Sequence, residues 1–428
     1  MKKIGFYLSN DNIANVDFTD FENGNPGVGG SEFSAIVIAT NLSRRNNNLD
    51  VILYCNKAGF FPNNLKKTVC GNLENAIKSA DKDDVDYFIV DEKVISHLLL
   101  GEYDGTMGFV LWANNPMTIP DVNFYASCKN VKKIINVGKE QMDLWIDHPV
   151  YKKFCFIYNS MYFDEKLDVA SLNKDKRGHN VVYIGNLVFN KGFHYLAKSW
   201  KKVLKSCPNA ELYVIGSGRL YDRNAKMGPL GIASASYEKL WSKYVTGDDG
   251  KILPSVHFLG ILGSEKNEIL KHCKVGVPNP SGLTETFGYT AVEMQSMGCN
   301  CTTKRCYGYL DTVLNVPTNI LYSNEFSLHE KIIKLLNTDE HDANYVLSEL
   351  KRKFSVSSVV PLWESLFKDM NDIPKYSKTN LMYRMKWLKY IHRYFDRYYM
   401  FPSVEVLLVK FDNIVVERYK RWRIRLCW

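Results

Sequence analysis

The sequence of 428 residues has no long apolar run. No stretch approaches the roughly 18 consecutive apolar residues that cross a lipid bilayer. The first apolar stretch, residues 4–8, ends at once in the polar residues 9–12, so it is too short for the apolar part of a secretory signal. We therefore expect a cytoplasmic protein in which residues 4–8 form the first buried strand.

Metal-binding motifs are also missing. The ten cysteines form no CxxC pair, and no histidine accompanies Cys299, Cys301 and Cys306 at the spacing of a zinc site. Scattered thiols of this kind are typical of reduced, partly buried cysteines in a cytosolic protein. We therefore expect no bound metal.

Two common phosphate-binding motifs are absent as well. Neither half of the chain has a GxGxxG turn after its first strand with an acidic residue about 20 positions further on, which argues against a Rossmann dehydrogenase. The glycine-rich residues 25–32 are not followed by the Gly-Lys-Ser/Thr of a P-loop. Neither of these two motifs therefore identifies a phosphate site in this chain.

An excess of positive charge is confined to one end of the chain. The formal net charge is +9, and residues 375–428 hold 13 Lys and Arg against 4 Asp and Glu. The preceding 374 residues hold 42 residues of each sign. Because a nucleic-acid enzyme usually carries its positive charge around the binding groove, we expect no nucleic-acid partner.

The basic tail, residues 375–428, combines cations with aromatic side chains. A helix at its start would place four cations on one face and apolar side chains opposite, interrupted by Arg384. The cations are Lys386, Lys389, Arg393 and Arg397, and the apolar residues are Leu381, Met385, Leu388, Ile391 and Phe395. This pattern fits an interfacial helix on an anionic membrane, at its inner face. A tail packed on the body with solvated charges is an equally weighted alternative.

Before the tail, short apolar runs alternate with helical stretches, which predicts parallel sheets covered on both faces. In the first half we expect strands at 4–8, 51–54, 87–90, 108–112, 133–136 and 154–158, and helices at 31–44 and 139–146. In the second half we expect strands at 181–184, 211–215, 256–259 and 275–277, and helices at 193–206 and 289–297.

A polar, charged segment at 164–180 interrupts this alternation and predicts a linker. We therefore expect a first Rossmann-like domain at 1–160, a linker at 161–180 and a second Rossmann-like domain at 181–355. A helix within 356–374 is expected to close the second domain, before the tail at 375–428.

Parallel sheets bind ligands at the carboxyl ends of their strands, where helix N-termini point inward. Gly29 and Gly30 precede a long helix whose first N–H groups favour an anion, with a plain flexible turn as the alternative. Gly185 ends a strand, and Lys191 follows shortly before a helix. Lys191 can offer a positive charge to a phosphate, although a solvated surface lysine is the alternative.

The most specific segment is residues 278–293, which follows an apolar strand and opens a helix. Glu285 lies in its loop and Glu293 on the helix, with seven residues between them. Two carboxylates about two helical turns apart can each bind the hydroxyls of a different ring of one ligand. The N–H groups around Phe287 and Gly288 would meet a diphosphate between those rings. A capped helix with exposed acids is the alternative.

Together these segments resemble the retaining glycosyltransferases of the GT-B fold, the bacterial hexosyltransferase type called glycosyltransferase group 1. The most specific match is the family's motif of two glutamates separated by seven residues, met by Glu285 and Glu293. The resemblance covers about residues 1–370. The further landmarks, in the family's order, are Gly29 and Gly30, then Gly185 with Lys191 and Gly192, residues 215–218 and residues 258–260. It implies an α/β protein of two Rossmann-like parallel-sheet domains facing across a cleft, plus the helical basic tail.

The resemblance implies a role for each matched position. Glu285 would bind the donor sugar, Glu293 the ribose, and Lys191 the diphosphate as it departs. Backbone contacts to the donor are implied for Gly29, Gly30, Gly216, Gly260, Phe287 and Gly288, and the loop after Gly260 would hold the base. Neither metal nor cofactor is implied, because a cation and helix N-termini stabilise the diphosphate of a UDP- or GDP-sugar. Residues 84–86, a possible DxD metal motif, resemble a solvated turn.

Two positions depart from the family's pattern. Asn186 stands where the family usually has an arginine, and Asn114 stands where it often has a histidine. We expect Asn186 to contact the donor, and Asn114 and Asn115 to lie on the acceptor side. Loss of the arginine removes a charge-assisted contact of about 1.5–3 kcal/mol, for which a nearby cation such as Arg219 is a candidate substitute.

The sequence therefore predicts a retaining transferase that moves a hexose-type sugar to a saccharide or lipid-linked saccharide, in surface polysaccharide or lipopolysaccharide synthesis. One alternative is a sugar-nucleotide epimerase of GT-B shape, which should show a richer set of acid and base residues in the cleft. The other is a nucleotide-sugar-binding protein that has lost turnover with the missing arginine and histidine.

Overall fold

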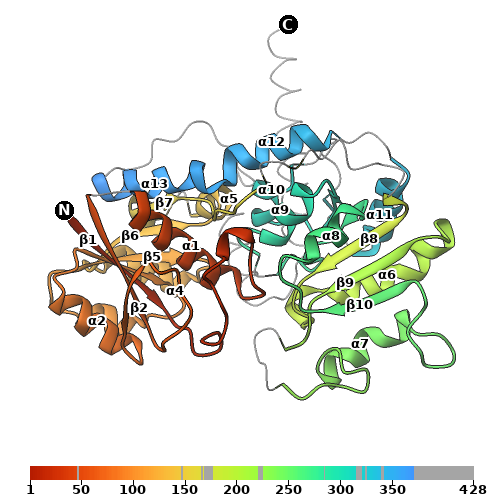
Figure 1. Ribbon diagram of the computed structural model, residues 1–428, viewed down its shortest axis with the longest axis horizontal. Helices are drawn as coiled ribbons and strands as arrows, with labels where there is room; N and C mark the ends of the chain where they lie inside the picture. The colour runs from red at the N-terminus through yellow and green to blue at the C-terminus, as the bar shows by residue number, and fades with distance from the viewer. Residues whose placement is uncertain are drawn as a thin grey trace, which may run out of the picture.

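The computed structural model describes residues 1–45, 48–145, 148–164, 167, 177–219, 225–283, 285–314, 321–322, 325–338 and 342–370. These residues form two domains side by side, each built on a parallel sheet with helices on both faces (Figure 1). The expected architecture of two Rossmann-like domains is thereby confirmed. The tail at 375–428, with its predicted interfacial helix, lies outside the described residues.

The first domain has a seven-stranded sheet in the order β3-β2-β1-β4-β5-β6-β7. Its strands are β1 (Lys2–Leu8), β2 (Leu49–Cys55), β3 (Lys66–Val69), β4 (Tyr87–Asp91), β5 (Gly108–Ala113), β6 (Val131–Asn136) and β7 (Phe154–Phe156). The six expected strands are all present. The edge strand β3 was not expected, because its residues are mostly exposed and form no apolar run.

Helices cover both faces of this sheet. They are α1 (Gly30–Arg45), α2 (Leu73–Lys82), α3 (His97–Glu102), α4 (Ile119–Ser127) and α5 (Lys139–Asp143). Helix α1 packs on one face through a nearly continuous buried stretch, whereas α2, α3 and α4 supply apolar side chains such as Ile77, Leu100 and Val122 to the other. A capping box between Thr118 and Asp121 defines the start of α4.

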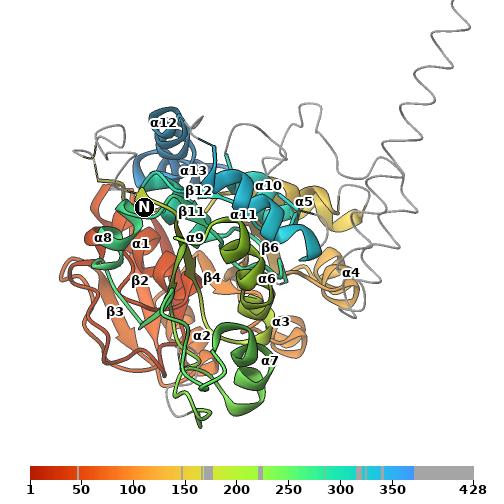
Figure 2. The ribbon, with the colours of Figure 1, turned by 90° about the vertical axis from the view of Figure 1, so that its right-hand side faces the viewer.

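The second domain has a five-stranded sheet in the order β10-β9-β8-β11-β12. Its strands are β8 (Asn180–Ile184), β9 (Glu211–Ile215), β10 (Val256–Gly260), β11 (Val275–Gly276) and β12 (Asn300–Cys301). Its helices are α6 (Phe193–Ser206), α7 (Ala235–Val245), α8 (Lys266–Lys271), α9 (Tyr289–Ser296), α10 (Tyr307–Thr312) and α11 (Leu328–Leu336). Helices α6, α7 and α11 cover the face nearest the viewer in Figure 2, and α8 and α9 cover the other.

The last two helices carry the chain back to the first domain. Helix α12 (Ala343–Phe354) passes over the junction, and α13 (Val356–Lys368) lies along the first domain (Figure 1). The expectation that residues 356–374 close the second domain was therefore wrong. The reason is the apolar face of α13, where Trp363 packs on Phe6 and Trp112 of the first sheet at ring distances of 5.8 Å and 4.7 Å.

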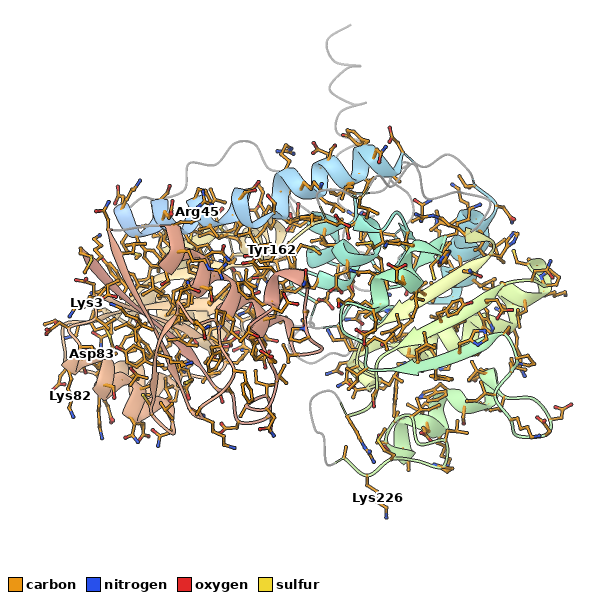
Figure 3. All side chains as sticks on the ribbon, in the orientation of Figure 1. Lys3, Arg45, Lys82, Asp83, Tyr162 and Lys226 are labelled. Atoms are coloured by element: carbon orange, nitrogen blue, oxygen red, sulfur yellow. The ribbon has the colours of Figure 1, made fainter. Side chains whose placement is uncertain are left out.

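The chain passes from one domain to the other twice, and the two connecting segments run side by side. Met161, on the first segment, donates its N–H to the carbonyl of Phe354 at 2.9 Å. Its own carbonyl accepts a hydrogen bond from the Val356 N–H at 3.3 Å. The neighbouring Tyr162, labelled near the junction in Figure 3, accepts a hydrogen bond from Asn41 of α1 at 2.7 Å. The two domains are thus tied at one edge by paired segments.

Two expected absences concern membranes and metals. Within the part of the chain that the structure describes, no helix has both the length and the apolar character needed to cross a membrane. The nine cysteines in that part form no disulfide with one another. The same residues contain no cluster of three or more His, Cys, Asp or Glu side chains able to hold a metal ion.

Candidate functional site

A cavity of about 180 Å³ lies between the two domains. The first domain lines it with Asn25 and with residues 27–30, the turn that leads into α1. The second domain lines it with residues at the ends of β8 and β9, the loops after β10 and β11, and the start of α9. The predicted donor-site residues that line it are Gly29, Gly30, Asn186, Lys191, Gly216, Glu285 and Glu293.

Lys191 and Glu285 form an ion pair in this cavity. The Nζ atom of Lys191 lies 3.0 Å from Oε2 of Glu285, and the same oxygen accepts a hydrogen bond from Asn279 at 3.0 Å. The side chains of Lys191 and Glu285 are only 21% and 14% exposed. Tyr183 holds the turn that carries the lysine, by donating its hydroxyl to the Lys191 carbonyl at 3.1 Å. A cation and a carboxylate are therefore fixed next to one another in the cavity wall.

Glu293 forms a second ion pair in the cavity, with Lys266 of α8. The Nζ atom of Lys266 lies 2.9 Å from Oε1 of Glu293, and the two side chains are 8% and 16% exposed. Both residues line the cavity. Lys266 was missed in the sequence because it belongs to none of the motif landmarks; the only signal was its place in the helix that follows the Gly260 turn.

Two glycines let the backbone form the cavity wall. A Cβ atom on Gly30 would lie 2.7 Å from the ring of Tyr289, the first residue of α9. The hydroxyl of Tyr289 donates to the Ser160 carbonyl at 3.2 Å and hydrogen-bonds to the hydroxyl of Ser34, so this contact joins the two domains. A Cβ atom on Gly216 would lie 1.9 Å from the Gly185 carbonyl oxygen, at a φ of 136° that favours glycine.

Asn186 leaves an unsatisfied polar group in the wall. Its side chain lines the cavity and the residue is 1% exposed, yet neither Nδ2 nor Oδ1 has a hydrogen-bond partner among the described residues. Leaving a buried polar group unpaired costs about 1–3 kcal/mol, and such groups are rare in folded proteins. A ligand in the cavity would satisfy this amide.

Three predicted backbone contacts do not line the cavity: Gly260, Phe287 and Gly288. The Phe287 ring packs in the core against Phe354, at a centroid distance of 5.2 Å. Gly288 is the N-cap of α9, and the Gly260 carbonyl accepts a hydrogen bond from the Gly216 N–H at 2.7 Å. The next two residues, Ile261 and Leu262, do line the cavity, in the loop that was predicted to hold the base.

Asn114 lines a second, smaller cavity of about 80 Å³ in the first domain. Its Nδ2 donates to Asp91 at 3.1 Å, and its Oδ1 has no partner among the described residues. Burial raises the pKa of Asp91, and the negative charge of Glu32 adds to this effect. Asn115 lines neither cavity; its carbonyl accepts from Gln141 at 3.2 Å.

The suggested substitute for the missing arginine lies elsewhere. Arg219 does not line the cavity, and its Nε donates to the Ala225 carbonyl at 3.3 Å in an exposed position. Among the described lining residues, the cations are Lys191 and Lys266. If the site recruits a second positive charge, the geometry favours Lys266.

Comparisons of the sequence with known proteins find glycosyltransferases. Residues 178–338 match the family described as Glycosyl transferases group 1. An uncharacterized glycosyltransferase of Haemophilus influenzae is 22% identical over 241 residues, a match that covers 51% of this chain and 63% of that protein. The chain thus spans less than two thirds of the length of this curated relative.

Solved structures share the whole two-domain fold. Alr3699/HepE of Anabaena, crystallised in complex with UDP and glucose, superposes with a TM-score of 0.61 at 14% identity, covering 86% of this chain and 100% of that chain. A glycosyltransferase of Rickettsia africae gives a TM-score of 0.62 at 14% identity, covering 86% and 98%. Identities at this level show the fold, which is GT-B. The match to the group 1 glycosyltransferases itself covers residues 178–338, which form most of the second domain.

Proposed function

We propose that this protein transfers a hexose-type sugar from a nucleotide-sugar donor to a saccharide or lipid-linked saccharide acceptor. One observation carries the proposal: a single cavity collects Lys191, Glu285 and Glu293 and faces the turn of Gly29 and Gly30. These residues come from three separate segments of the chain. Together they supply a cation for a diphosphate and two carboxylates for the hydroxyls of two rings.

The chemistry follows from where charge develops. As the bond between the sugar and the diphosphate breaks, negative charge grows on the phosphate oxygen. Lys191 and the first N–H groups of α9 stabilise that charge, so this step requires no metal ion. Glu285 orients the sugar through its hydroxyls. Retention of configuration, with the donor phosphate taking the acceptor's proton, is the outcome that the family resemblance supports.

UDP is the first donor nucleotide to test. The Anabaena protein of the same fold was crystallised with UDP and glucose. In this chain, the apolar side chains of Ile261 and Leu262 line the cavity beyond Gly260, where a base could pack. A screen of UDP-, GDP-, dTDP- and ADP-sugars, read as release of the free nucleotide, identifies the donor.

The smaller cavity of the first domain is our choice for the acceptor. It combines the amide of Asn114 with the carboxylates of Asp91 and Glu32, which suit the hydroxyls of a neutral saccharide. The two cavities meet the same loop, because Thr286, next to Glu285, donates its hydroxyl to the Asn114 carbonyl at 2.5 Å. An acceptor bound there would lie beside the donor-binding loop.

Glu285→Gln is the direct test of the transfer site. Transfer from the donor found in the screen should fall strongly, because the amide keeps the size of the carboxylate but loses its charge. Glu268→Gln is the matched control, since Glu268 lies on α8 with its side chain 72% exposed. Undiminished transfer by Glu285→Gln would remove this residue from the site.

The alternatives predict different products. An epimerase should offer a richer acid and base set, but the described lining contains no histidine, and both of its glutamates are paired with lysines. Conversion of the donor sugar without an acceptor would support the epimerase. Nucleotide binding without turnover of any donor would support a binding protein.

Membrane association through the tail remains a separate part of the proposal. The clustered cations and aromatic residues of 375–428 support contact with an anionic surface at the inner face of a membrane. Binding of the full chain and of a chain ending at residue 374 to anionic vesicles tests this. Equal partitioning of the two proteins would end the membrane hypothesis.

A further inference from the structure

Lys266 and Lys191 form similar ion pairs in different parts of the donor cavity. Each lysine pairs with one of the two motif glutamates, at 3.0 Å for Lys191 and Glu285 and at 2.9 Å for Lys266 and Glu293. All four side chains line the same cavity. Among the described residues, the charged side chains of the wall therefore form two matched ion pairs and sum to zero.

A neutral wall is poorly suited to a diphosphate unless the pairs exchange partners. A diphosphate brings at least two negative charges, and carboxylates left next to it would repel them. If the ammonium groups turn to the phosphates, the carboxylates become free to accept hydrogen bonds from sugar and ribose hydroxyls. A lysine suits such an exchange because its four-carbon stem and compact charge can reorient.

The side chain of Lys266 is buried, unlike that of an ordinary surface lysine. Its side chain is 8% exposed, less than the 21% of Lys191, and lysines are almost never buried to this degree without a partner. Its neighbour on α8, Lys271, has its side chain 25% exposed and pairs with the exposed Glu268 at 2.6 Å. The same short helix therefore offers one lysine to the donor cavity and holds another, Lys271, outside it.

We propose that Lys266 is a diphosphate-binding residue of the donor site. In the empty protein it neutralises Glu293. When a nucleoside diphosphate binds, the Lys266 ammonium moves to a phosphate oxygen and releases Glu293 to the ribose hydroxyls. This inference rests on the proposed function and deepens it: the donor site holds two cations, one from each pair.

The environment of Asn186 supports the same assignment. Its amide is neutral, and neither of its polar atoms has a hydrogen-bond partner among the residues that the structure describes. The amide can donate a hydrogen bond to a phosphate but cannot balance its charge. With Arg219 outside the cavity, Lys266 is the cation that completes the described wall besides Lys191.

A purely structural role makes a different prediction. If the ion pair only fastens α8 to α9, its loss should loosen the site for every ligand, with or without phosphate. If Lys266 contacts the diphosphate, removing its charge should weaken the binding of UDP and leave the binding of uridine unchanged. The ratio of the two affinities separates these roles.

The test measures the affinity of the full chain for UDP by calorimetry and for uridine by ligand-observed NMR. We expect Lys266→Met to lower the affinity for UDP about 10- to 100-fold, as for a lost charge-assisted contact. The affinity for uridine should change less than about twofold. Lys271→Met is the control and should bind UDP as the wild type does. Asn186→Arg added to Lys266→Met should restore UDP affinity, because it returns a cation to the wall.

Two results would overturn the inference: unchanged UDP affinity in Lys266→Met, or an equal loss for UDP and uridine. Should the methionine variant fail to fold, Lys266→Gln, whose amide can still hydrogen-bond Glu293, takes its place with the same expected result. Failure of the proposed function looks different, because the wild-type protein would then turn over no donor in the screen of UDP-, GDP-, dTDP- and ADP-sugars, whatever its affinity for UDP.

Discussion

The two domains share one plan of parallel sheet and helices, but they contribute differently to the donor cavity. Every charged side chain among the described lining residues comes from the second domain. The first domain offers Asn25 and residues 27–30, a mostly backbone surface. The second domain thus contributes the charged side chains of the described wall, and the first contributes mainly backbone.

The first domain has a polar cavity of its own, and the charged residues that line it differ from those of the donor cavity. Its smaller cavity is lined by two acidic residues, Glu32 and Asp91, without a described cation. Under the proposed function, a diphosphate would bind on one side of the junction and a neutral polyhydroxyl ligand on the other. Two domains of one architecture thus line their cavities with different sets of charged side chains.

Contacts across the junction join the two sides. Asp311 of α10 accepts hydrogen bonds from the Glu140 N–H at 2.9 Å and from the Tyr158 hydroxyl at 3.1 Å, both in the first domain. Tyr289 makes a second such contact with Ser34 and Ser160. Removing groups on either side, or at the junction, tests how far the two domains act separately.

The largest effect is expected from the helix that returns to the first domain. Trp363→Ala should lower the free energy of unfolding by about 3–5 kcal/mol, because it removes a fully buried ring from the core of that domain. Denaturant unfolding measures the change. Leu362→Ala on the same helix, where Leu362 is 47% exposed, should cost far less. Equal effects of the two variants would mean that α13 is not part of the first domain's core.

Next in size is the loss of the charge at the leaving group. Lys191→Met should reduce turnover about 100- to 1000-fold with little change in melting temperature, because the cation acts on charge that develops during the reaction. Steady-state kinetics with the identified donor measure it, and Lys198→Met, exposed on α6, is the control. Full activity in Lys191→Met would show that this lysine does not stabilise the leaving group.

A smaller effect is expected from the backbone surface of the first domain. Gly30→Ala places a methyl group 2.7 Å from the Tyr289 ring, so the junction must shift. We expect kcat/KM to fall about tenfold, as for a modest overpacking strain. Gly101→Ala is the matched control, since a Cβ there meets Phe124 at an ordinary 3.8 Å. Unchanged kcat/KM in Gly30→Ala would show that close contact at this turn does not matter.

The smallest effect concerns pH and the junction. Burial raises the pKa of Asp311 to about 6, and burial together with Asp311 raises the pKa of Glu140 to about 7. Both carboxyl groups bind protons more tightly when the two domains are docked than they would if the domains separated. Docking is therefore strongest below their ordinary pKa values and weakens as the pH rises through about 6 and about 7.

Small-angle scattering between about pH 5 and about pH 8 measures this change as an increase in the radius of gyration. Asp311→Asn keeps an acceptor for the Glu140 N–H but removes one titrating group, so the increase should be smaller. An identical pH profile for the wild type and Asp311→Asn would show that this carboxylate does not control docking.

The sequence predicted those parts of the molecule that local patterns determine. The alternation of apolar runs located β1, β4 and β5, and α6 begins and ends at the expected residues. The spacing of Glu285 and Glu293, with the glycine turns, identified residues that the fold brings into one cavity. Chemistry at the ends of parallel strands depends on topology, which such patterns indicate well.

Other features depend on partners distant in the chain. The apolar face of α13 was visible in the sequence, but its period does not say which domain it covers. Lys266 became a site residue only because α8 lies beside α9, which no local signal announces. Asp311 resembles any helix acid until the two domains are docked. Pairings across the junction therefore had to come from the structure.

A crystal structure with UDP bound tests the central claim most directly. The account predicts the diphosphate within hydrogen-bonding distance of Lys191 Nζ, the ribose hydroxyls on Glu293, and the phosphates facing the N–H groups of Gly29 and Gly30. UDP bound at another surface, with both glutamates still held by their lysines, would contradict it.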